Sequence, residues 1–301
     1  MSMVRAWPVV LVLGLLSACK EAVDEGTLDD DGDGLTNDEE AALGSNPASA
    51  DSDADGLLDG EEQAAGTDPN KADTDGDTYL DLDEMNESTD PLDPESRIYT
   101  GYWPYYAGKE ELLQNGLDGE TFKLNKQFAR IQAVDQFGET VDLYDFYNLD
   151  GRPLMFDVSA EWCGPCNEVA AFLDGSDQMF GIDVDPGFIE LRTAINQGEM
   201  YWITVLSESN GYDTADVQTC ERWYDAYPKD QIPVLADEEW DDFYDGEIDS
   251  ITEYIDLVGW PTLILMDGEL KPKTTSDTSY VDSLCLACEM LGISTDAYWC
   301  P

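Results

Sequence analysis

Cys163 and Cys166 are the residues of this sequence whose type and spacing best suit covalent chemistry. They belong to the run Trp-Cys-Gly-Pro-Cys at 162–166, which follows an apolar run at 154–158 and precedes a helical pattern from Glu168. At a strand-to-helix turn, unpaired amides and the helix dipole favour the thiolate of the first cysteine. The second thiol lies one turn further on, where it can attack a mixed disulfide formed at the first. The spacing therefore predicts a redox-active dithiol.

Two other interpretations of the pair are a structural disulfide and half of a zinc site. Structural zinc takes four sulfur or nitrogen ligands, and the chain has no histidine, so Cys285 and Cys288 would have to supply the other two. The placement between a strand and a helix favours redox chemistry over both alternatives.

The composition excludes several other kinds of chemistry and partner. Because histidine is absent, serine–histidine hydrolases, zincins and haem–histidine sites are excluded by count. The chain carries 67 acidic and 14 basic side chains, a formal net charge of −53. Binding to a nucleic acid or to an anionic membrane surface needs clustered cations, so we expect neither. A hydrophobic content of 42% still allows a folded core.

A second set of chemically suited residues recurs every 22 positions from Asp29. Each copy places aspartates at positions 1, 3 and 5 and a glutamate at position 12, and the first two copies have glycine at position 6. Ca²⁺ takes oxygen ligands, and the EF-hand loop supplies them at this spacing, with the glycine permitting a sharp turn. The candidate Ca²⁺ ligands are Asp29, Asp31, Asp33 and Glu40; Asp51, Asp53, Asp55 and Glu62; and Asp73, Asp75, Asp77 and Glu84.

These copies resemble thrombospondin type 3 repeats, in which calcium-loaded loops form most of the fold. They differ from EF-hands because proline and turn formers occupy the segments where an EF-hand has a helix before the loop. Thr78 replaces the glycine in the third copy, so we expect a strained or weaker loop there. The alternative is an acidic, disordered linker, but such a linker would not hold this spacing three times. Without calcium, the segment should be an expanded coil.

The dithiol must be positioned by strands and helices, and the pattern after Pro94 provides them. A hairpin is expected within 128–143, after which apolar strands alternate with helices. The expected strands are 154–158, 201–206 and 262–266, and the expected helices are 168–173, 214–227 and 280–291. This alternation predicts an α/β fold, a sheet covered by helices on both faces.

The run Phe-Asp-Val-Ser-Ala-Glu-Trp-Cys-Gly-Pro-Cys at 156–166 resembles the active-site strand and turn of thioredoxin. Gly-Trp-Pro-Thr at 259–262 resembles the cis-proline loop of that family. The hairpin and the run Ile-Pro-Val-Leu-Ala-Asp at 232–237 are similar to the TlpA-like and peroxiredoxin-like branch. The resemblance covers about residues 125–291 and implies a thioredoxin-like fold with a central mixed sheet. Because no Thr-x-x-Cys site is present, peroxide reduction is the weaker enzymatic interpretation.

The resemblance also implies a role for each matching residue. Cys163, beside Trp162, would be the nucleophile, and Cys166 would resolve the mixed disulfide. Pro261, if cis, would face the dithiol and shape a groove for an extended peptide. Asp157 matches the buried acid that moves the proton of the resolving thiol.

Ser159 and Asn167 depart from the thioredoxin pattern, in which a large aromatic residue and a lysine are usual. These changes leave open whether the dithiol acts as a reductant or an oxidant. The remaining cysteines after Cys19 are Cys220, Cys285, Cys288 and Cys300. We expect the last of these to bond with one member of the Cys-Leu-Ala-Cys pair at 285–288, which could alternatively relay electrons.

The N-terminus has the outline of a bacterial secretory signal with a lipobox. Arg5 precedes an apolar run at 9–16, shorter than the roughly 20 residues of a membrane-spanning helix, and Leu-Ser-Ala-Cys follows at 16–19. This pattern predicts a lipid on Cys19, which would anchor the chain in the cell envelope outside the cytoplasm. The alternative is an ordinary secretory signal or a buried helix. The predicted organisation is a signal peptide at 1–18, a lipid-anchored linker at 19–28, three calcium-binding repeats at 29–98 and a thioredoxin-like domain at 99–301.

Two functions fit these features. The first is a thiol–disulfide oxidoreductase with protein disulfides as substrates and an unidentified electron donor or acceptor. The second is a calcium-dependent surface or adhesion lipoprotein whose thioredoxin-like domain binds partners without redox turnover. The dithiol favours the first.

Overall fold

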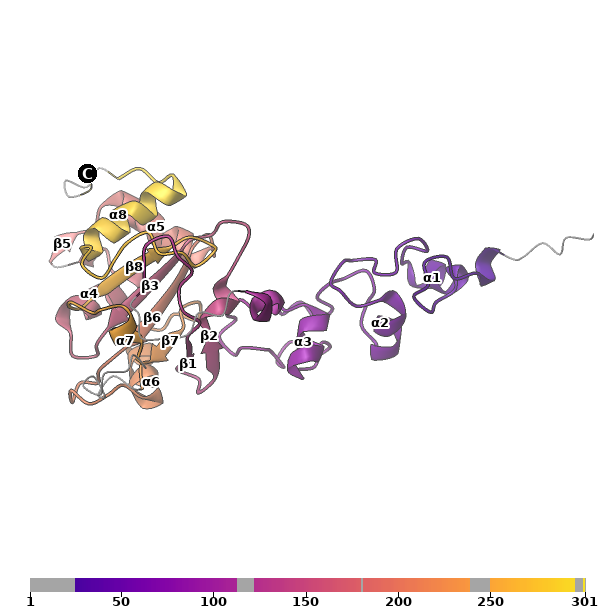
Figure 1. Ribbon diagram of the computed structural model, residues 1–301, viewed down its shortest axis with the longest axis horizontal. Coiled ribbons are helices and arrows are strands. Elements are labelled where there is room, and N and C mark those ends of the chain that lie inside the picture. Colours follow the sequence, from indigo (N-terminus) through magenta and orange to yellow (C-terminus); the bar gives the residue numbers. More distant parts are fainter. Residues whose placement is uncertain (1–24, 113–121, 180, 239–249, 296–299, 301) are drawn as a thin grey trace, which may run out of the picture. The chain divides into compact units, whose positions relative to one another are not determined.

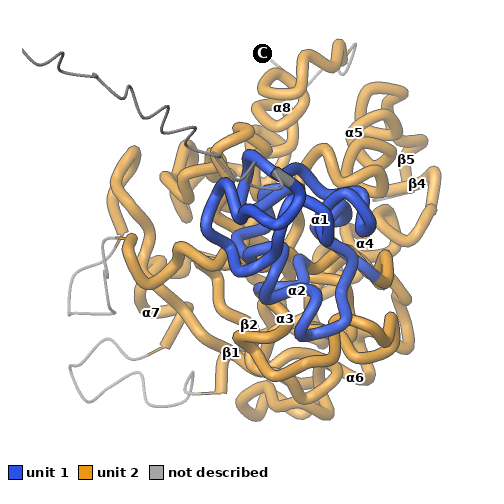
Figure 2. Tube along the Cα trace, turned by 90° about the vertical axis from the view of Figure 1, so that its right-hand side faces the viewer, with its two compact units in different colours: residues 1–74, 80–82 blue, residues 75–79, 83–301 orange. Residues whose placement is uncertain are grey.

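The computed structural model describes residues 25–112, 122–179, 181–238, 250–295 and 300 (Figure 1). The chain divides into two compact units, one of residues 1–74 with 80–82 and one of residues 75–79 with 83–301 (Figure 2). Cys19 and the predicted lipobox lie outside the described residues. Within the described ranges, no helix has the length and apolar character needed to cross a bilayer.

The first unit is built from acidic loops, each followed by a helix of seven residues. α1 spans Asn37–Leu43 and α2 spans Asp59–Ala65, after a 3-10 turn, η1, at Glu25–Thr27. Thr36 caps α1, because its side chain accepts from the Glu39 amide while the Glu39 carboxylate accepts from the Thr36 amide. α3, Asp81–Glu87, begins in the first unit and continues into the second.

The first unit buries carboxylates where an ordinary domain buries apolar groups. Leu35 and Leu57 are its buried large aliphatic side chains within the described part, one from each loop. Its buried acids are Glu40, Asp55, Asp59, Glu62 and Asp81. So small an apolar core cannot offset the conformational entropy of folding, so another source of stability is required.

The second unit is organised around a four-stranded sheet in the order β7-β6-β3-β8. β3 (Leu154–Ser159) lies in the middle, parallel to β6 (Tyr201–Leu206) and antiparallel to β8 (Thr262–Met266). β7 (Val234–Ala236) continues the sheet parallel to β6. The predicted mixed sheet and its three longest strands are confirmed.

Both faces of this sheet are covered. One face packs against α4 (Gly164–Leu173), α5 (Pro186–Asn196), α6 (Val217–Ala226) and α8 (Tyr280–Leu291). The other packs against the hairpin of β1 (Gln132–Val134) and β2 (Thr140–Asp142), the 3-10 turn η3 (Leu143–Phe146) and the short helix α7 (Ile251–Tyr254). Smaller elements are η2 (Ala107–Glu111), β4 (Gln178–Met179) and β5 (Ile182–Asp183). The expected α/β class with helices on both faces is confirmed.

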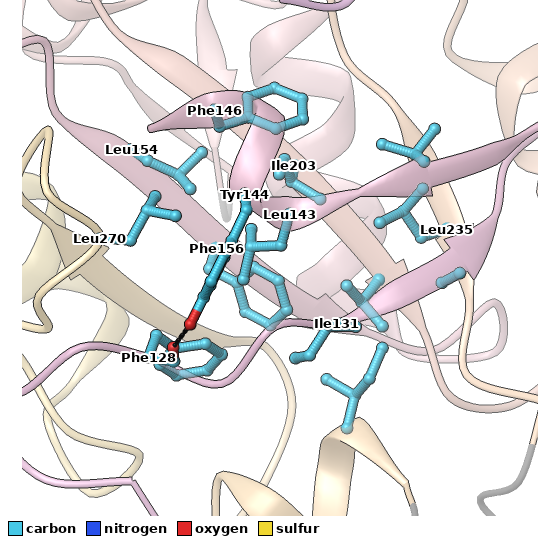
Figure 3. Close-up of a cluster of buried hydrophobic side chains, with 14 of the residues drawn as sticks. Phe128, Ile131, Leu143, Tyr144, Phe146, Leu154, Phe156, Ile203, Leu235 and Leu270 are labelled. Carbon is cyan, nitrogen blue, oxygen red and sulfur yellow. Dashed lines mark hydrogen bonds between the residues drawn. The ribbon is translucent and has the colours of Figure 1, made fainter. Parts of the chain in front are cut away.

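An aromatic core fills the face beneath the hairpin (Figure 3). Phe128 contacts the rings of Phe156 and Tyr254 at centroid distances of 5.5 and 4.9 Å. The Tyr144 hydroxyl donates to the Phe128 carbonyl at 2.8 Å, so its polar end is satisfied inside the core. This core fixes β3, the strand that leads into the dithiol.

Candidate active site and metal sites

The dithiol stands at the start of α4, directly after β3. Cys163 is the residue that caps the helix, and its Sγ accepts from the Cys166 amide at 3.2 Å. The two cysteines form a disulfide with their Cα atoms 5.3 Å apart. Pro165 occupies the first turn, where its missing N–H costs no helical hydrogen bond. The helix therefore begins at Gly164, earlier than the predicted Glu168.

The two sulfurs differ in access to solvent. The residue exposure is 3% for Cys163 and 0% for Cys166, while Gly164 and Pro165 between them are exposed. Both sulfurs are buried in the disulfide form, and Cys163, next to the exposed Gly164 and Pro165, is the less enclosed of the two. The amides and dipole of the α4 N-terminus stabilise a thiolate at that position.

Aromatic side chains from three segments lie beside the dithiol. The Trp162 ring contacts the rings of Tyr212 and Trp260, both at 5.3 Å between centroids. Its indole N–H donates to Glu208 Oε2 at 2.6 Å, and the Trp260 indole N–H donates to Ser207 Oγ at 2.9 Å. The loop after β6 is thereby held against the active-site turn.

Glu161 and Arg222 add a second connection between this loop, α6 and the active-site turn. Arg222 donates to both carboxylate oxygens of Glu161, at 2.9 and 2.8 Å, and the Asn210 amide donates to Glu161 Oε2 at 2.8 Å. The guanidinium holds the pKa of the Glu161 carboxyl below its usual range. No sequence pattern indicates this pairing, because the two residues are 61 positions apart.

The Trp260–Pro261 peptide bond is cis, as the resemblance to the thioredoxin loop requires. Pro261 is buried at the start of β8, and Thr262 Oγ1 donates to the Gly259 carbonyl at 2.7 Å. Trp260 packs against the apolar cluster that contains Cys163 and Cys166. The loop at 259–262 therefore lies on the dithiol side of the domain.

Asp157 is an ionisable group inside the sheet, and its exposure is only 2%. Ser159 donates to its Oδ1 at 2.7 Å, and Thr204 donates to Oδ2 at 3.4 Å. Burial raises the pKa of Asp157 to about 7, although these hydrogen bonds oppose the shift. Side chains alternate along a strand, so Asp157 shares a face with Met155, which packs in the same cluster as α4 residues.

The other cysteines of the described chain are either bonded to each other or buried as free thiols. Cys285 is bonded to Cys300, the kind of pairing expected from the sequence. Cys220 and Cys288 are free and buried, and burial raises the pKa of both thiols, to about 12 for Cys288. With Cys163 and Cys285 both in disulfides, the four-cysteine zinc alternative does not form among the described residues.

The predicted metal ligands of the first two loops converge. Carboxylate oxygens of Asp29, Asp31 and Asp33 lie within 4.8 Å of one another, as do those of Asp51, Asp53 and Asp55. The backbone of each loop is wound by its own aspartates, and in the first loop Asp29 accepts from the Gly32 and Gly34 amides at 2.7 and 3.2 Å. Position 6 has a left-handed backbone, with φ of 100° at Gly34 and 103° at Gly56.

The glutamate at position 12 is the clearest indication that these loops are suited to a cation. Glu40 has 0% exposure, and neither of its carboxylate oxygens has a hydrogen-bond partner within the described residues. Burial, followed by the repulsion of nearby aspartates, raises the pKa of Glu40, and the same causes raise that of Glu62 to about 8. A buried, unpartnered carboxylate among others is costly unless a cation neutralises it. The residues fit a hard divalent cation such as Ca²⁺.

Acidic side chains and amides of one repeat also lie near the acidic loop of the preceding repeat, an arrangement that was not predicted from the sequence. Asp59, at position 9 of the second repeat, brings a carboxylate oxygen within 4.8 Å of those of Asp33 and Glu40 in the first. The Gly60 amide at the start of α2 donates to Asp33 Oδ2 at 3.2 Å. In the next pair, the Leu82 amide donates to Asp55, and Asp81 adds negative charge near Glu62. The aspartate at position 9 of the second and third repeats, Asp59 and Asp81, was the sequence feature that could have indicated this arrangement.

The third copy is divided between the units. Asp73 belongs to the first unit, whereas Asp75, Asp77 and Glu84 belong to the second. Thr78 adopts φ of 94°, the left-handed conformation of the glycines at position 6, which is strained for a β-branched residue. Tyr79 explains why part of this copy joins the second unit, because its hydroxyl donates to the Trp103 carbonyl at 2.8 Å within the core.

Comparisons with known proteins match separate parts of the chain. Residues 29–50 and 51–72 match the family model described as a bacterial TSP3 repeat. The search of curated proteins finds no match. Among solved structures, the thioredoxin domain of a thiol-disulfide oxidoreductase from Bacteroides vulgatus is 19% identical, with a TM-score of 0.37, over 56% of this chain and 98% of that one.

Two further solved structures are similar at comparable distance. The pneumococcal exposed lipoprotein thioredoxin from Streptococcus pneumoniae is 19% identical, with a TM-score of 0.37, over 54% of this chain and 98% of that one. Peroxidoxin BcpB from Mycobacterium tuberculosis is 15% identical, with a TM-score of 0.37, over 57% and 97% of the two chains. Residues 29–50 and 51–72 are thus similar to bacterial TSP3 repeats.

Proposed function

We propose that this protein is a thiol–disulfide oxidoreductase, anchored in the cell envelope through Cys19, that exchanges disulfides with extracytoplasmic proteins. The observation that carries the proposal is the asymmetry of the dithiol. Cys163 caps α4 next to the exposed Gly164 and Pro165 and is 3% exposed, while Cys166 is fully buried one turn later. A structural disulfide has no need of this arrangement, whereas exchange requires one sulfur to meet the substrate and the other to displace it.

Exchange as a reductant proceeds in two balanced steps. The Cys163 thiolate attacks one sulfur of a substrate disulfide, which forms a mixed disulfide and releases the other substrate sulfur as a thiolate. The Cys166 thiolate then attacks the Cys163 sulfur, so that the Cys163–Cys166 disulfide forms and the second substrate sulfur leaves as a thiolate; the substrate disulfide has then gained two electrons and the dithiol has lost two. Oxidation of a substrate dithiol is the reverse sequence. A dithiol donor or disulfide acceptor restores the starting state.

Asp157 is suited to move the proton of Cys166 in the second step. A thiol must lose its proton before it can attack, and a carboxylate with a pKa near 7 can accept a proton and return it at neutral pH. Burial sets that pKa, and the hydroxyls of Ser159 and Thr204 orient the carboxylate. The cis-proline loop, in which Gly259 and Trp260 are half-buried, would offer its backbone groups to an extended peptide.

The repeats would hold Ca²⁺ and act as a stiffened segment next to the lipid anchor. Asp29, Asp31, Asp33 and Glu40 would bind one ion together with Asp59, and the second loop offers the corresponding set. Bound Ca²⁺ would supply positive charge to carboxylates that are buried without a counter-ion. The same tether also suits a surface adhesion protein, so the choice between the two functions depends on the dithiol.

The experiment that tests the proposal is the reduction potential of the Cys163–Cys166 couple in thiol buffers, with alkylation and mass mapping of each cysteine. A potential below about −220 mV would identify a reductant, and one above about −150 mV an oxidant or isomerase. The Cys163→Ser variant should lose exchange completely, while the Cys220→Ser variant should retain it. If the Cys163–Cys166 pair cannot be reduced and reoxidised in any buffer, the protein would instead bind partners without redox turnover.

A further inference from the structure

We infer that Asn167, oriented by Tyr227, is a positioning residue that lowers the reduction potential of the Cys163–Cys166 couple by holding the active-site turn closed. The inference rests on the proposed function, because it concerns how the same dithiol is regulated. Asn167 directly follows the second cysteine, at the position where a lysine is usual in the thioredoxin pattern. We call Asn167 and Tyr227 together the asparagine clamp.

The side-chain amide of Asn167 joins the active-site turn to two helices. Its Nδ2 donates to the Cys163 carbonyl at 2.7 Å and to the Glu161 carbonyl at 3.1 Å. Its Oδ1 accepts from the hydroxyl of Tyr227, the residue that ends α6, at 2.8 Å. The residues that lead into the dithiol are thereby tied both to the first turn of α4 and to the end of α6.

An amide is the side chain that can make all of these bonds together. Two carbonyls need N–H donors and a hydroxyl needs an acceptor, and asparagine carries both kinds of group. A lysine at this position would have donors only and could not accept from Tyr227. Asn167 and Tyr227 are both half-buried, so water competes less for these bonds than it would on an exposed surface. The pairing of Arg222 with Glu161 is a separate connection that variants of the clamp leave in place.

The clamp is present in the disulfide form, and this decides the sign of its effect. Reduction replaces the bond between the two sulfurs by a longer nonbonded contact, so the turn must open slightly. Hydrogen bonds that hold the turn closed therefore favour the disulfide over the dithiol, because they keep the two thiols at a high effective concentration. A dithiol that favours its disulfide more strongly is a stronger reductant.

The same closed turn assists the second step of exchange. In that step the Cys166 thiolate attacks the Cys163 sulfur, which forms the bond between the two cysteines. The bond from Cys163 to the substrate sulfur breaks, and the substrate sulfur leaves as a thiolate. Because the clamp holds the Cys163 carbonyl against α4, it keeps the attacked sulfur near the start of the helix that carries Cys166.

The competing interpretation is that the amide only satisfies the carbonyls of the turn. Such hydrogen bonds would stabilise the oxidised and the reduced protein equally. The reduction potential depends on the difference between the two forms, so it would not change when the amide is removed. The two interpretations therefore differ in the potential, whereas both allow a lower melting temperature.

The test uses the full chain in detergent with calcium, equilibrated in glutathione buffers and trapped with an alkylating reagent. Asn167→Ala removes the amide, whereas Tyr227→Phe removes one hydroxyl and keeps the ring that packs on Trp223. We expect Asn167→Ala to shift the equilibrium about tenfold towards the dithiol, a rise of about 30 mV for a two-electron couple. Tyr227→Phe should shift it about threefold in the same direction.

Tyr224→Phe is the matched control. It removes a hydroxyl from the same helix, but that hydroxyl donates to Asp230 and not to the active-site turn. This variant should have the potential of the wild-type protein. Tyr227→Phe added to Asn167→Ala should have no further effect, because the hydroxyl acts through the amide.

Kinetics separate positioning from a general loosening of the domain. The probe is a short peptide whose single cysteine is joined by a disulfide to a fluorescent thiol. In a Cys166→Ser background only the attack by Cys163 remains, and Asn167→Ala should change its rate by no more than about twofold. With Cys166 present, the mixed disulfide between Cys163 and the peptide should last about tenfold longer in Asn167→Ala than in the wild-type protein.

The possible failures are distinguishable. If the wild-type pair cannot be reduced and reoxidised, the proposed function itself is wrong. If the pair cycles but Asn167→Ala and Tyr227→Phe keep the wild-type potential, or if Tyr224→Phe shifts it equally, the dithiol is active and the clamp does not set its potential. A lower potential in Asn167→Ala would also overturn the inference. Should Asn167→Ala fail to fold, Tyr227→Phe against Tyr224→Phe decides the question.

Discussion

At the scale of single residues, the site depends on groups that are held in unfavourable surroundings. Asp157 is an acid inside a sheet, and Thr78 is a β-branched residue with a left-handed backbone. Each costs free energy in the folded protein. Asp157 lies where proton transfer would use it, whereas Thr78 stands where the first two loops have a glycine with the same left-handed backbone. The two residues therefore give opposite predictions.

Asp157→Asn should stabilise the fold at pH 8 and slow exchange. The carboxyl is protonated in the folded protein up to about pH 7 but only to about pH 3.8 in the unfolded chain, so its contribution to stability falls as pH rises between these values. The accumulated cost at pH 8 is at most about 4 kcal/mol, of which the neutral amide should recover a part. Chemical denaturation at pH 5 and pH 8 measures this.

The same variant should lower the rate of exchange roughly a hundredfold and remove an inflection near pH 7 from its pH profile. Asp183→Asn, an exposed acid on β5, serves as the control and should change neither quantity. An unaltered inflection in the Asp157 variant would exclude this carboxyl from the proton transfer.

Thr78→Gly should raise the free energy of unfolding by about 1 kcal/mol, because glycine adopts a positive φ without a steric penalty. Gly34→Thr makes the converse change at the equivalent position of the first loop, where a new Cβ would meet no atom within 4 Å, and should destabilise by a similar amount. Thermal melts with calcium measure both. Equal melting temperatures for all three proteins would show that the backbone at position 6 carries no strain.

At the scale of elements, the start of α2 is tied to the loop of the preceding repeat. The first turn of α2 donates to Asp33, and its first residue, Asp59, lies with the acids of the preceding loop. The active-site domain uses the same principle, since the N-terminus of α4 holds the reactive sulfur. In both cases the start of a helix brings amide groups to a negatively charged centre.

Asp59→Asn should therefore weaken calcium binding at the first loop, by about tenfold for one ion in isothermal titration. Double variants show which of the two loops Asp59 serves. Added to Glu40→Gln, which disables the first loop, Asp59→Asn should have little further effect, whereas added to Glu62→Gln it should weaken the remaining ion. Asp38→Asn, an exposed acid of the first repeat, is the matched control. The opposite pattern would assign Asp59 to its own loop.

The strands and helices also show which parts of the fold could be predicted from the sequence. The strands at 154–158, 201–206 and 262–266 were predictable because each is an apolar run between turn residues, and Cys163 and Cys166 because their spacing carries a mechanism. The start of α4 was misplaced, since a cysteine cap and a proline in the first turn do not resemble a helical pattern. Glu161 with Arg222 and Trp162 with Tyr212 were out of reach, because pairs distant in sequence become visible only after the sheet is assembled.

At the scale of the whole molecule, two units with different sources of stability share one chain. The second unit has aromatic and aliphatic cores on both faces of its sheet. The first unit has two buried leucines and a group of buried acids, whose repulsion a cation must relieve. The two units should consequently respond differently to a chelator.

Removal of calcium should unfold the first unit and spare the second. With EDTA, the radius of gyration from small-angle scattering should increase and helical circular dichroism should fall by an amount that α1 and α2 account for. The near-ultraviolet signal of the second unit and its dithiol potential should persist. A first unit that stays compact in EDTA would show that the carboxylates are neutralised by protons instead.

Because Cys220 and Cys288 are buried, alkylation of the native protein would report the redox state of the Cys163–Cys166 pair. Both thiols are buried with raised pKa values, and Cys285 and Cys300 are joined, so the folded, oxidised chain offers an alkylating reagent no fast-reacting sulfur among the described residues. Reduction of the Cys163–Cys166 disulfide would produce a thiol that reacts with the reagent. The mass of label taken up by protein quenched directly from cells would then count the fraction of molecules waiting in the reduced form, and so reveal the direction in which electrons are flowing in its own compartment.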